Sequence, residues 1–167
     1  MRYCTAPWRL TYVNKSLKMK DCIFCQALKK KDDQESLILY RAKYNFVILN
    51  RYPYTTGHLM VAPYRHLASL EKAPKEVLFE AAELTQTALK ILRKAYQPQG
   101  FNLGMNLGQP AGAGVADHFH LHVVPRWPGD SNFMPIIGHT KVFCEDLAAT
   151  FNRLRPFFAR QEKKQEK

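Results

Sequence analysis

Apolar and polar positions along the chain predict three helices, and the apolar positions are clearest in one of them. Over residues 75–96 they mark one face of a helix, and the segment contains neither Gly nor Pro. A shorter helix is predicted over residues 22–31. A C-terminal helix is predicted over residues 143–159, with Pro156 expected to end it early.

Short runs of β-branched and aromatic residues between turn-forming residues predict the strands. The expected strands cover residues 37–40, 46–49, 58–61, 101–106 and 119–124. The polar residues 31–35 are expected to break the first helix, residues 52–57 to form a turn, and Pro63 to follow the third strand. Neighbouring strands with segregated helices predict an α+β fold, with a mainly antiparallel sheet and two principal helices.

The length of 167 residues suits one globular domain. We expect that domain over residues 1–158, followed by a charged tail over residues 159–167 that is frayed or disordered. The sequence contains no apolar run of membrane-spanning length and no recognisable secretory signal. These features predict a cytoplasmic protein without membrane contact.

The charge balance is strongly basic, with 25 Lys and Arg against 14 Asp and Glu and a formal net charge of +11. Such an excess favours polyanionic ligands without identifying one. Much of it lies in residues 29–31 and 160–167, which are typical of solvated or frayed segments. Because no nucleic-acid-binding signature accompanies the charge, nucleic-acid binding is not expected as the main function.

Residues 118–125, with the sequence HFHLHVVP, carry the strongest chemical signal. His118, His120 and His122 alternate with apolar residues at the period of a strand, so the three imidazoles are expected to share one open face. The alternatives are an exposed strand face with incidental histidines, or a trio that only binds a metal.

A glycine-rich segment, residues 108–114, directly precedes the histidines. Its glycines allow backbone N–H groups to surround phosphate oxygens. Alone, the segment would be interpreted as a flexible connection between two strands. Beside three histidines it favours phosphate chemistry.

This motif resembles that of the histidine-triad family of nucleotide hydrolases and transferases. The similarity covers roughly residues 6–158 and includes residues 6–9, 22–25, 47–50, 57–63, 125–127 and 129–133. The segment after the triad is similar to the bacterial branch that contains diadenosine tetraphosphate phosphorylases. The resemblance implies a homodimeric enzyme acting on a nucleotide or a dinucleoside polyphosphate.

The resemblance also implies roles for individual side chains. His120 matches the nucleophile, and a neutral imidazole can attack phosphorus if a backbone carbonyl fixes its tautomer. His122 matches the residue that stabilises the transferred phosphate. Asn50 matches a ribose-binding residue, with capping of the next turn as the alternative, and His58 matches a histidine near the phosphate, with a buried structural histidine as the alternative.

Further contacts to sugar or phosphate are expected from the glycine-rich segment. The side chains would be those of Asn106 and Gln109. Many relatives have Gln, Ser or Thr just before the first histidine, whereas this chain has none over residues 114–117. Backbone N–H groups would therefore hold the phosphate, and the expected positions are Gly112, Gly114 and Val115.

Four residues, Cys22, Cys25, His66 and His118, resemble the zinc site found in part of this family. Two thiolates and two imidazoles suit tetrahedral zinc, and four protein ligands leave no position for a catalytic water. Such a zinc ion would be structural. The alternative is a pair of unmetallated thiols with His66 at the surface. Cys4 and Cys144 receive no role.

The sequence and the resemblance predict cleavage of a dinucleoside polyphosphate, of the diadenosine tetraphosphate type, through a covalent nucleotidyl-His120 intermediate. The acceptor would be orthophosphate or water. The alternative within the same class is a nucleoside phosphoramidase or a mononucleotide hydrolase. A nucleotide-binding module without useful turnover is the alternative outside it, and the complete histidine triad argues against that alternative.

Overall fold

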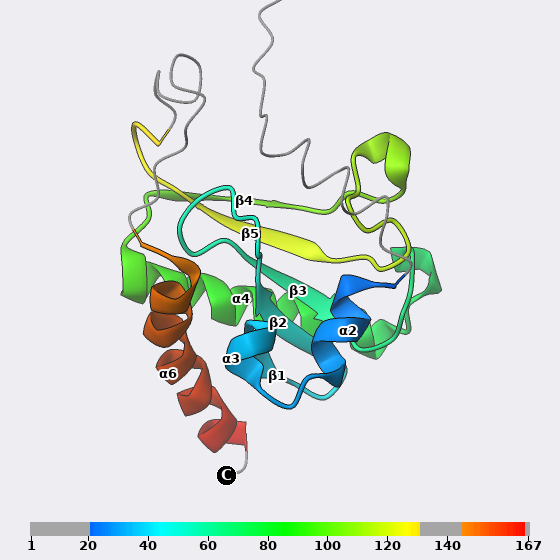
Figure 1. Cartoon of the computed structure of the whole chain (residues 1–167), viewed down its shortest axis with the longest axis horizontal. Coiled ribbons are helices and arrows are strands. Elements are labelled where there is room, and N and C mark those ends of the chain that lie inside the picture. Colours follow the sequence, from blue (N-terminus) through cyan, green and yellow to red (C-terminus); the bar gives the residue numbers. More distant parts are fainter. Residues whose placement is uncertain (1–20, 131–144, 166–167) are drawn as a thin grey trace, which may run out of the picture.

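A computed structural model describes residues 21–130 and 145–165 (Figure 1). Five strands form one antiparallel sheet in the order β1-β2-β3-β5-β4. Their bounds are β1 Ile38–Arg41, β2 Asn45–Leu49, β3 Leu59–Pro63, β4 Gly100–Gly104 and β5 Leu121–Arg126. The α-helices are α2 Ile23–Lys29, α3 Asp33–Ser36, α4 Lys75–Tyr96 and α6 Leu147–Gln165. The predicted α+β fold is therefore confirmed, with α4 and α6 as its principal helices.

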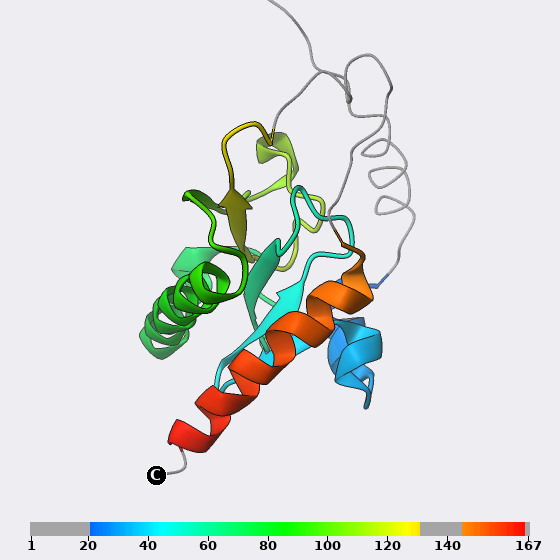
Figure 2. The same cartoon turned by 90° about the vertical axis from the view of Figure 1, so that its left-hand side faces the viewer.

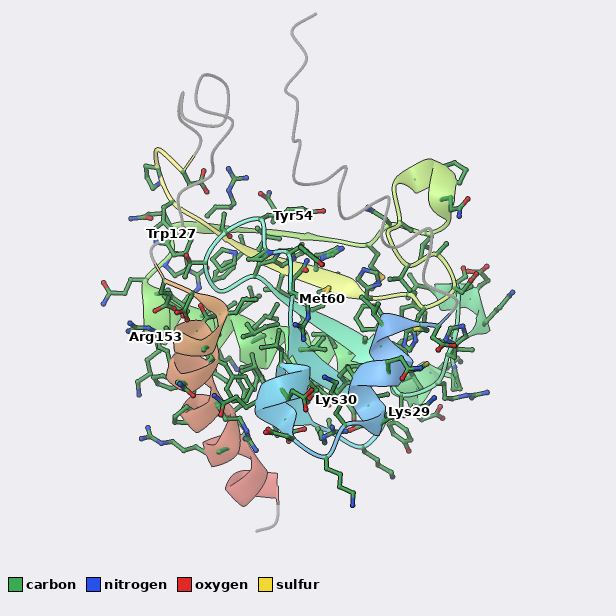
Figure 3. All side chains as sticks on the ribbon, viewed as in Figure 1. Lys29, Lys30, Tyr54, Met60, Trp127 and Arg153 are labelled. Carbon is green, nitrogen blue, oxygen red and sulfur yellow. The ribbon has the colours of Figure 1, made fainter. Side chains whose placement is uncertain are left out.

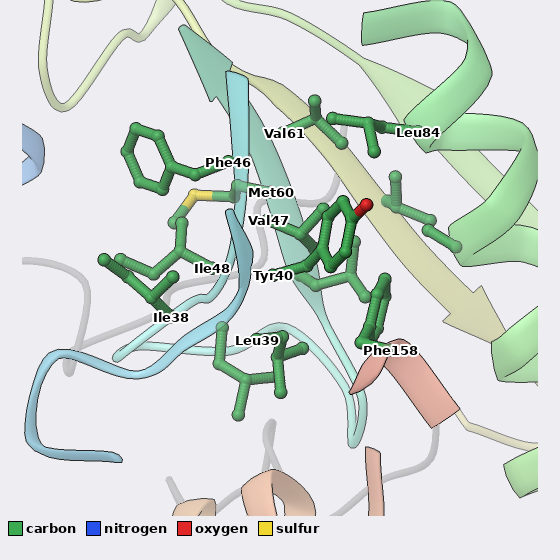
Figure 4. Close-up of a cluster of buried hydrophobic side chains, with 14 of the residues drawn as sticks. Ile38, Leu39, Tyr40, Phe46, Val47, Ile48, Met60, Val61, Leu84 and Phe158 are labelled. Atoms are coloured by element: carbon green, nitrogen blue, oxygen red, sulfur yellow. The ribbon is translucent and has the colours of Figure 1, made fainter. Parts of the chain in front are cut away.

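Helices cover the sheet on both faces. Figure 2 shows α4 on one side of the strands and α2 on the other. Side chains alternate between these faces, so Phe46 and Met60 point away from Val47 and Val61 in the core (Figure 4). Phe24 of α2 packs against Phe46, with ring centroids 6.4 Å apart. The sheet is therefore covered on both faces, and the histidines lie in β5 and in the segment just before it.

Two short local signals differ from their predictions. The polar segment expected to break the first helix forms α3, because the Asp32 side chain accepts hydrogen bonds from the N–H groups of Gln34 and Glu35. The third strand includes Pro63, whose ring sits at the strand end, where a missing N–H is tolerated.

The C-terminal helix α6 begins at Leu147 and continues through Pro156 to Gln165, so its expected end near residue 159 was too early. Pro156 removes the hydrogen bond to the carbonyl of Asn152, but both residues are exposed and water can reach that carbonyl. Leu154 and Phe158 on the other side of the helix are fully buried and hold it against the core. The start expected at residue 143 and Cys144 lie outside the described residues.

Within the described ranges, the search for a helix both long enough and apolar enough to cross a bilayer finds no candidate. The division into one domain and a tail stays a prediction. Cys4 and the matching residues 6–9 and 131–133 also lie outside the described ranges.

Candidate active site

The three histidines of the motif do not lie on a single strand. His122 belongs to β5, whereas His118 and His120 precede it. The chain leaves the sheet there because the Phe119 N–H donates to the Leu67 carbonyl, at 2.7 Å, rather than to β3. The expected strand start at residue 119 was therefore two residues too early.

The imidazoles of His118 and His120 are buried rather than open to solvent. Phe24 covers both, with ring centroids 5.0 Å from His118 and 4.8 Å from His120. The expected open face therefore exists only around His122, which is half-buried. Helix α2 covers His118 and His120 through Phe24. The periodicity of the sequence did not predict this contact.

The tautomer of His120 is fixed by the backbone. Its Nδ1 lies 2.9 Å from the carbonyl oxygen of His118, which can only accept, so Nδ1 carries the proton. Burial lowers the pKa of His120 below its usual value and favours the neutral ring. The lone pair of a neutral His120 is then on Nε2, as a nucleophile requires.

The tautomer of His122 is fixed through His58. The N–H of Tyr54 donates to His58 Nδ1 at 3.0 Å, so the proton of a neutral His58 is on Nε2. That Nε2 lies 3.0 Å from His122 Nδ1 and donates to it. A neutral His122 consequently carries its own proton on Nε2, which suits a donor to a phosphate oxygen.

Asn50 lies beside this pair and also caps the turn after β2. Its Oδ1 accepts from the Tyr52 N–H at 2.9 Å, and its Nδ2 lies 3.4 Å from His58 Nδ1. The capping alternative for Asn50 is thus present in the structure. His58 is 1% exposed and hydrogen-bonded, as its structural alternative required, yet it contacts His122 directly.

The glycine-rich segment forms a tight loop. Gly108 and Gly112 have φ values of 80° and 84°, which favour glycine, and flank the short 3₁₀ helix Gln109–Ala111. The Gly112 N–H donates to the Gln109 carbonyl at 2.8 Å, so Gly112 already has an internal acceptor. Among the predicted backbone donors this leaves Gly114 and Val115 as the better candidates for a phosphate.

Asn106 and Gln109 lie in different surroundings. Asn106 donates to the Gly112 carbonyl at 3.2 Å and lines a cleft that His122 also lines. Gln109 is exposed and does not line that cleft. The structure therefore brings Asn50, His58, His122 and Asn106 around one region and leaves the Gln109 side chain outside the cleft.

The four predicted metal ligands come together from distant parts of the chain. One donor atom from each of Cys22, Cys25, His66 and His118 lies within 4.8 Å of the others. His118 Nδ1 lies 3.3 Å from the Cys22 sulfur and 3.8 Å from the Cys25 sulfur. Tetrahedral zinc places such donors about 3.3 to 3.8 Å apart, so the set fits zinc.

His118 is held in the orientation that a ligand needs. Its Nε2 donates to the Pro63 carbonyl at 2.9 Å, which leaves Nδ1 facing the thiols. Burial lowers the pKa of His118 to about 4, so the ring is neutral at physiological pH. Burial also raises the pKa of the Cys22 thiol, which a bound cation would counteract.

Sequence reasoning missed three residues around the site. Phe24 covers the buried rings, Tyr54 stacks on His58 with centroids 4.8 Å apart, and Arg126 lines the cleft beside His122. The strand pattern could have predicted Arg126, because residues 122, 124 and 126 alternate along β5 and share one face. Nothing in the local sequence signalled Phe24 or Tyr54.

Comparison with known proteins agrees with this arrangement. The HIT domain family matches residues 31–129. The AP-4-A phosphorylase of Mycobacterium tuberculosis is 45% identical over 129 residues, 77% of this chain and 66% of that protein. The adenosine 5′-monophosphoramidase of Saccharomyces cerevisiae is 33% identical, over 63% of this chain and 62% of that protein.

Among solved structures, a zinc-bound histidine triad family protein from Mycobacterium smegmatis superposes with a TM-score of 0.67 at 26% identity. The match covers 89% of this chain and 98% of that one. The chain therefore belongs to the HIT domain family. It spans slightly less than two thirds of the length of the M. tuberculosis phosphorylase, with 66% of that protein covered.

Proposed function

We propose that this protein cleaves dinucleoside polyphosphates of the diadenosine tetraphosphate type and transfers the nucleotidyl group through His120 to orthophosphate. The observation that carries the proposal is the hydrogen bond from His120 Nδ1 to the His118 carbonyl, because it leaves the Nε2 lone pair for phosphorus. Identity of 45% to a phosphorylase supports the choice of substrate and acceptor.

In the first step, His120 Nε2 attacks the phosphorus next to one adenosine. The N–P bond forms, the P–O bond to the next phosphate breaks, and ATP leaves. The imidazole becomes cationic, and the His118 carbonyl stabilises the proton on Nδ1. His122 donates its Nε2 proton in a hydrogen bond to the transferred phosphate, where negative charge develops.

In the second step, an oxygen of orthophosphate attacks the same phosphorus. The N–P bond breaks, ADP is released and His120 becomes neutral again. Water in the same position would give AMP. Backbone N–H groups of Gly114 and Val115, with the Asn106 side chain, are the proposed donors to these anions, and Asn50 is the proposed ribose contact.

Zinc is the proposed occupant of the centre formed by Cys22, Cys25, His66 and His118. Borderline-soft zinc suits two thiolates and two imidazoles, and a reducing cytoplasm would keep both thiols available. When bound, it would cross-link α2, the loop after β3 and the segment before β5. It would take no part in the reaction, because all four positions are protein ligands.

A homodimer is proposed through the outer edge of β4. In the described part of the chain, β4 pairs only with β5, so its other edge is open to a second strand. Leu103 in this strand is 49% exposed. Natural sheets rarely leave such an edge uncovered, and pairing with a second copy would satisfy its hydrogen bonds.

If zinc binds as proposed, the purified protein should contain one zinc per chain by elemental analysis. Cys22→Ser should reduce that content and lower the melting temperature, because metal binding to the folded state stabilises it. Ser69→Ala, at a half-buried bend outside the four proposed ligands, serves as the control and should keep the metal. Metal-free wild-type protein with unchanged stability in Cys22→Ser would refute the zinc site.

Light scattering should give twice the chain mass of 19.3 kDa for the wild type. Leu103→Glu should give the mass of one chain, because a carboxylate would be buried at the paired edge. Asn152→Asp adds the same charge on α6, which packs at the opposite edge of the sheet, and should leave the dimer intact. A dimeric Leu103→Glu variant would exclude the β4 edge.

His120→Ala should lower turnover of diadenosine tetraphosphate by about a thousandfold or more, because the covalent route is lost. Adenine-labelled substrate should label wild-type protein transiently and leave the variant unlabelled. Binding of AMP, followed by calorimetry, should persist in both. A variant that keeps more than about a tenth of the rate would exclude His120 as nucleophile, since tenfold is only about 1.4 kcal/mol of barrier.

The reaction products show whether orthophosphate or water accepts the nucleotidyl group. With diadenosine tetraphosphate and millimolar orthophosphate, chromatography should show ATP and ADP in equal amounts, formed faster than AMP. The same reaction without orthophosphate should give ATP and AMP slowly. If AMP dominates in both reactions, the protein is a hydrolase, and if only adenosine phosphoramidate is cleaved, the phosphoramidase alternative holds.

A further inference from the structure

A cleft of about 450 Å³ opens beside His122, on the side of β5 away from Asn50. Its floor includes Asn102 of β4 and His122, Val124 and Arg126 of β5. Its wall is the turn after β2, which Figure 1 shows passing over β4 and β5, with Tyr54 labelled in Figure 3. A hydrogen bond of 2.9 Å from Thr55 to the Pro125 carbonyl fixes this wall.

We propose that this cleft binds the polyphosphate of the leaving nucleotide and that Arg126 selects substrates by the length of the leaving group. This inference rests on the function proposed above. It assigns to the chain a second binding region, which adjoins the contacts proposed for the transferred nucleotide and shares His122 and Asn106 with them. Its ligand is a nucleoside triphosphate as it departs.

The spacing of side chains along β5 determines how long a leaving group must be to reach Arg126. His122, Val124 and Arg126 share one face, since they pair in register with Gly104, Asn102 and Gly100 of β4. Four residues of a strand span about 13 Å, so Arg126 lies well beyond a phosphate held at His122. A short leaving group such as ammonia cannot reach Arg126, whereas a triphosphate carrying a nucleoside can extend toward it.

The order of the strands indicates the direction in which the leaving group departs. Asn50, the proposed ribose contact, follows β2, while the cleft lies over β5 and β4, on the other side of the His58–His122 pair. In phosphoryl transfer the attacking and leaving atoms lie roughly in line across phosphorus. The leaving group therefore departs opposite His120 Nε2, in a different direction from the nucleoside held near β2, and the cleft over β5 and β4 can receive it.

The guanidinium of Arg126 is oriented before any ligand binds. Nε and Nη2 donate to the two carboxylate oxygens of Asp130, at 2.6 and 2.8 Å, and Nη1 donates to Asn102 Oδ1 at 2.7 Å. Three of its five N–H groups are thereby used, which leaves two for an anion. The side chain is 40% exposed, while that of Asp130 is only 15% exposed. Arg126 thus presents donors and also shields a carboxylate that would repel phosphate.

The same ion pair also closes the turn after β5, where the Trp127 N–H lies 3.3 Å from Asp130 Oδ2. A purely structural role would therefore affect stability and would slow all substrates alike. A role in binding the leaving group would affect only substrates whose leaving group reaches Arg126. The comparison of two substrates separates these roles.

The experiment measures kcat/KM for diadenosine tetraphosphate and for adenosine 5′-phosphoramidate, which share the transferred group. Arg126→Gln should lower kcat/KM for the tetraphosphate by about tenfold or more, because charge-assisted hydrogen bonds are lost and Asp130 is exposed. The kcat/KM for the phosphoramidate should change by less than about twofold. Arg160→Gln, on α6, removes the same charge outside the cleft and should alter neither substrate selectively.

Equal effects of Arg126→Gln on both substrates, or no effect on either, would overturn the assignment while leaving the proposed function standing. Asn102→Leu provides a second variant in case Arg126→Gln folds poorly. It removes the acceptor that orients Nη1 and should shift selectivity in the same direction. Melting temperatures of both variants identify any loss that comes from folding alone.

A binding measurement keeps the inference testable without turnover. Calorimetry with inorganic tripolyphosphate should show binding to the wild type that Arg126→Gln weakens by about fivefold or more, with AMP binding unchanged. If the wild type cleaves neither substrate yet this difference appears, the proposed function fails and the cleft assignment survives. Equal tripolyphosphate affinity in both proteins refutes the cleft assignment.

Discussion

The peptide carbonyl and the imidazole of His118 bind different partners, and the site depends on both at once. The carbonyl accepts the proton of His120 Nδ1, while the ring donates to the Pro63 carbonyl and turns Nδ1 toward Cys22. A rotation of this residue that broke one contact would disturb the others. The proposed metal centre and the proposed nucleophile therefore share one rigid residue, and that rigidity explains why a structural ion would matter so close to the chemistry.

Backbone groups at two distant points set opposite tautomers in neighbouring rings. The His118 carbonyl places the His120 proton on Nδ1, and the Tyr54 N–H, acting through His58, places the His122 proton on Nε2. One ring then offers a lone pair and the next offers a donor, with centroids 4.8 Å apart. Burial lowers the pKa of His120 and favours the neutral ring on which this division depends.

Charge acts at two ranges in this protein. The formal net charge of +11 is spread widely and raises the concentration of any polyanion near the surface. It cannot distinguish one polyphosphate from another. Among the described residues that line the cleft, Arg126 is the one Lys or Arg side chain, and Asp130 and Asn102 hold its donors in a fixed plane. Selectivity among substrates would come from that geometry, and the distributed charge would chiefly affect the rate of encounter.

The sequence alone determined the helix over residues 75–96, the approximate positions of all five strands and the identity of the chemical groups, because periodicity and residue type are local properties. Tertiary structure decided which faces are covered. Phe24 lies about 95 positions before the histidines that it buries, and Leu67 draws Phe119 away from the sheet. The direction of each imidazole was also beyond the sequence, since it depends on a carbonyl and an N–H that only the folded chain brings within hydrogen-bond distance.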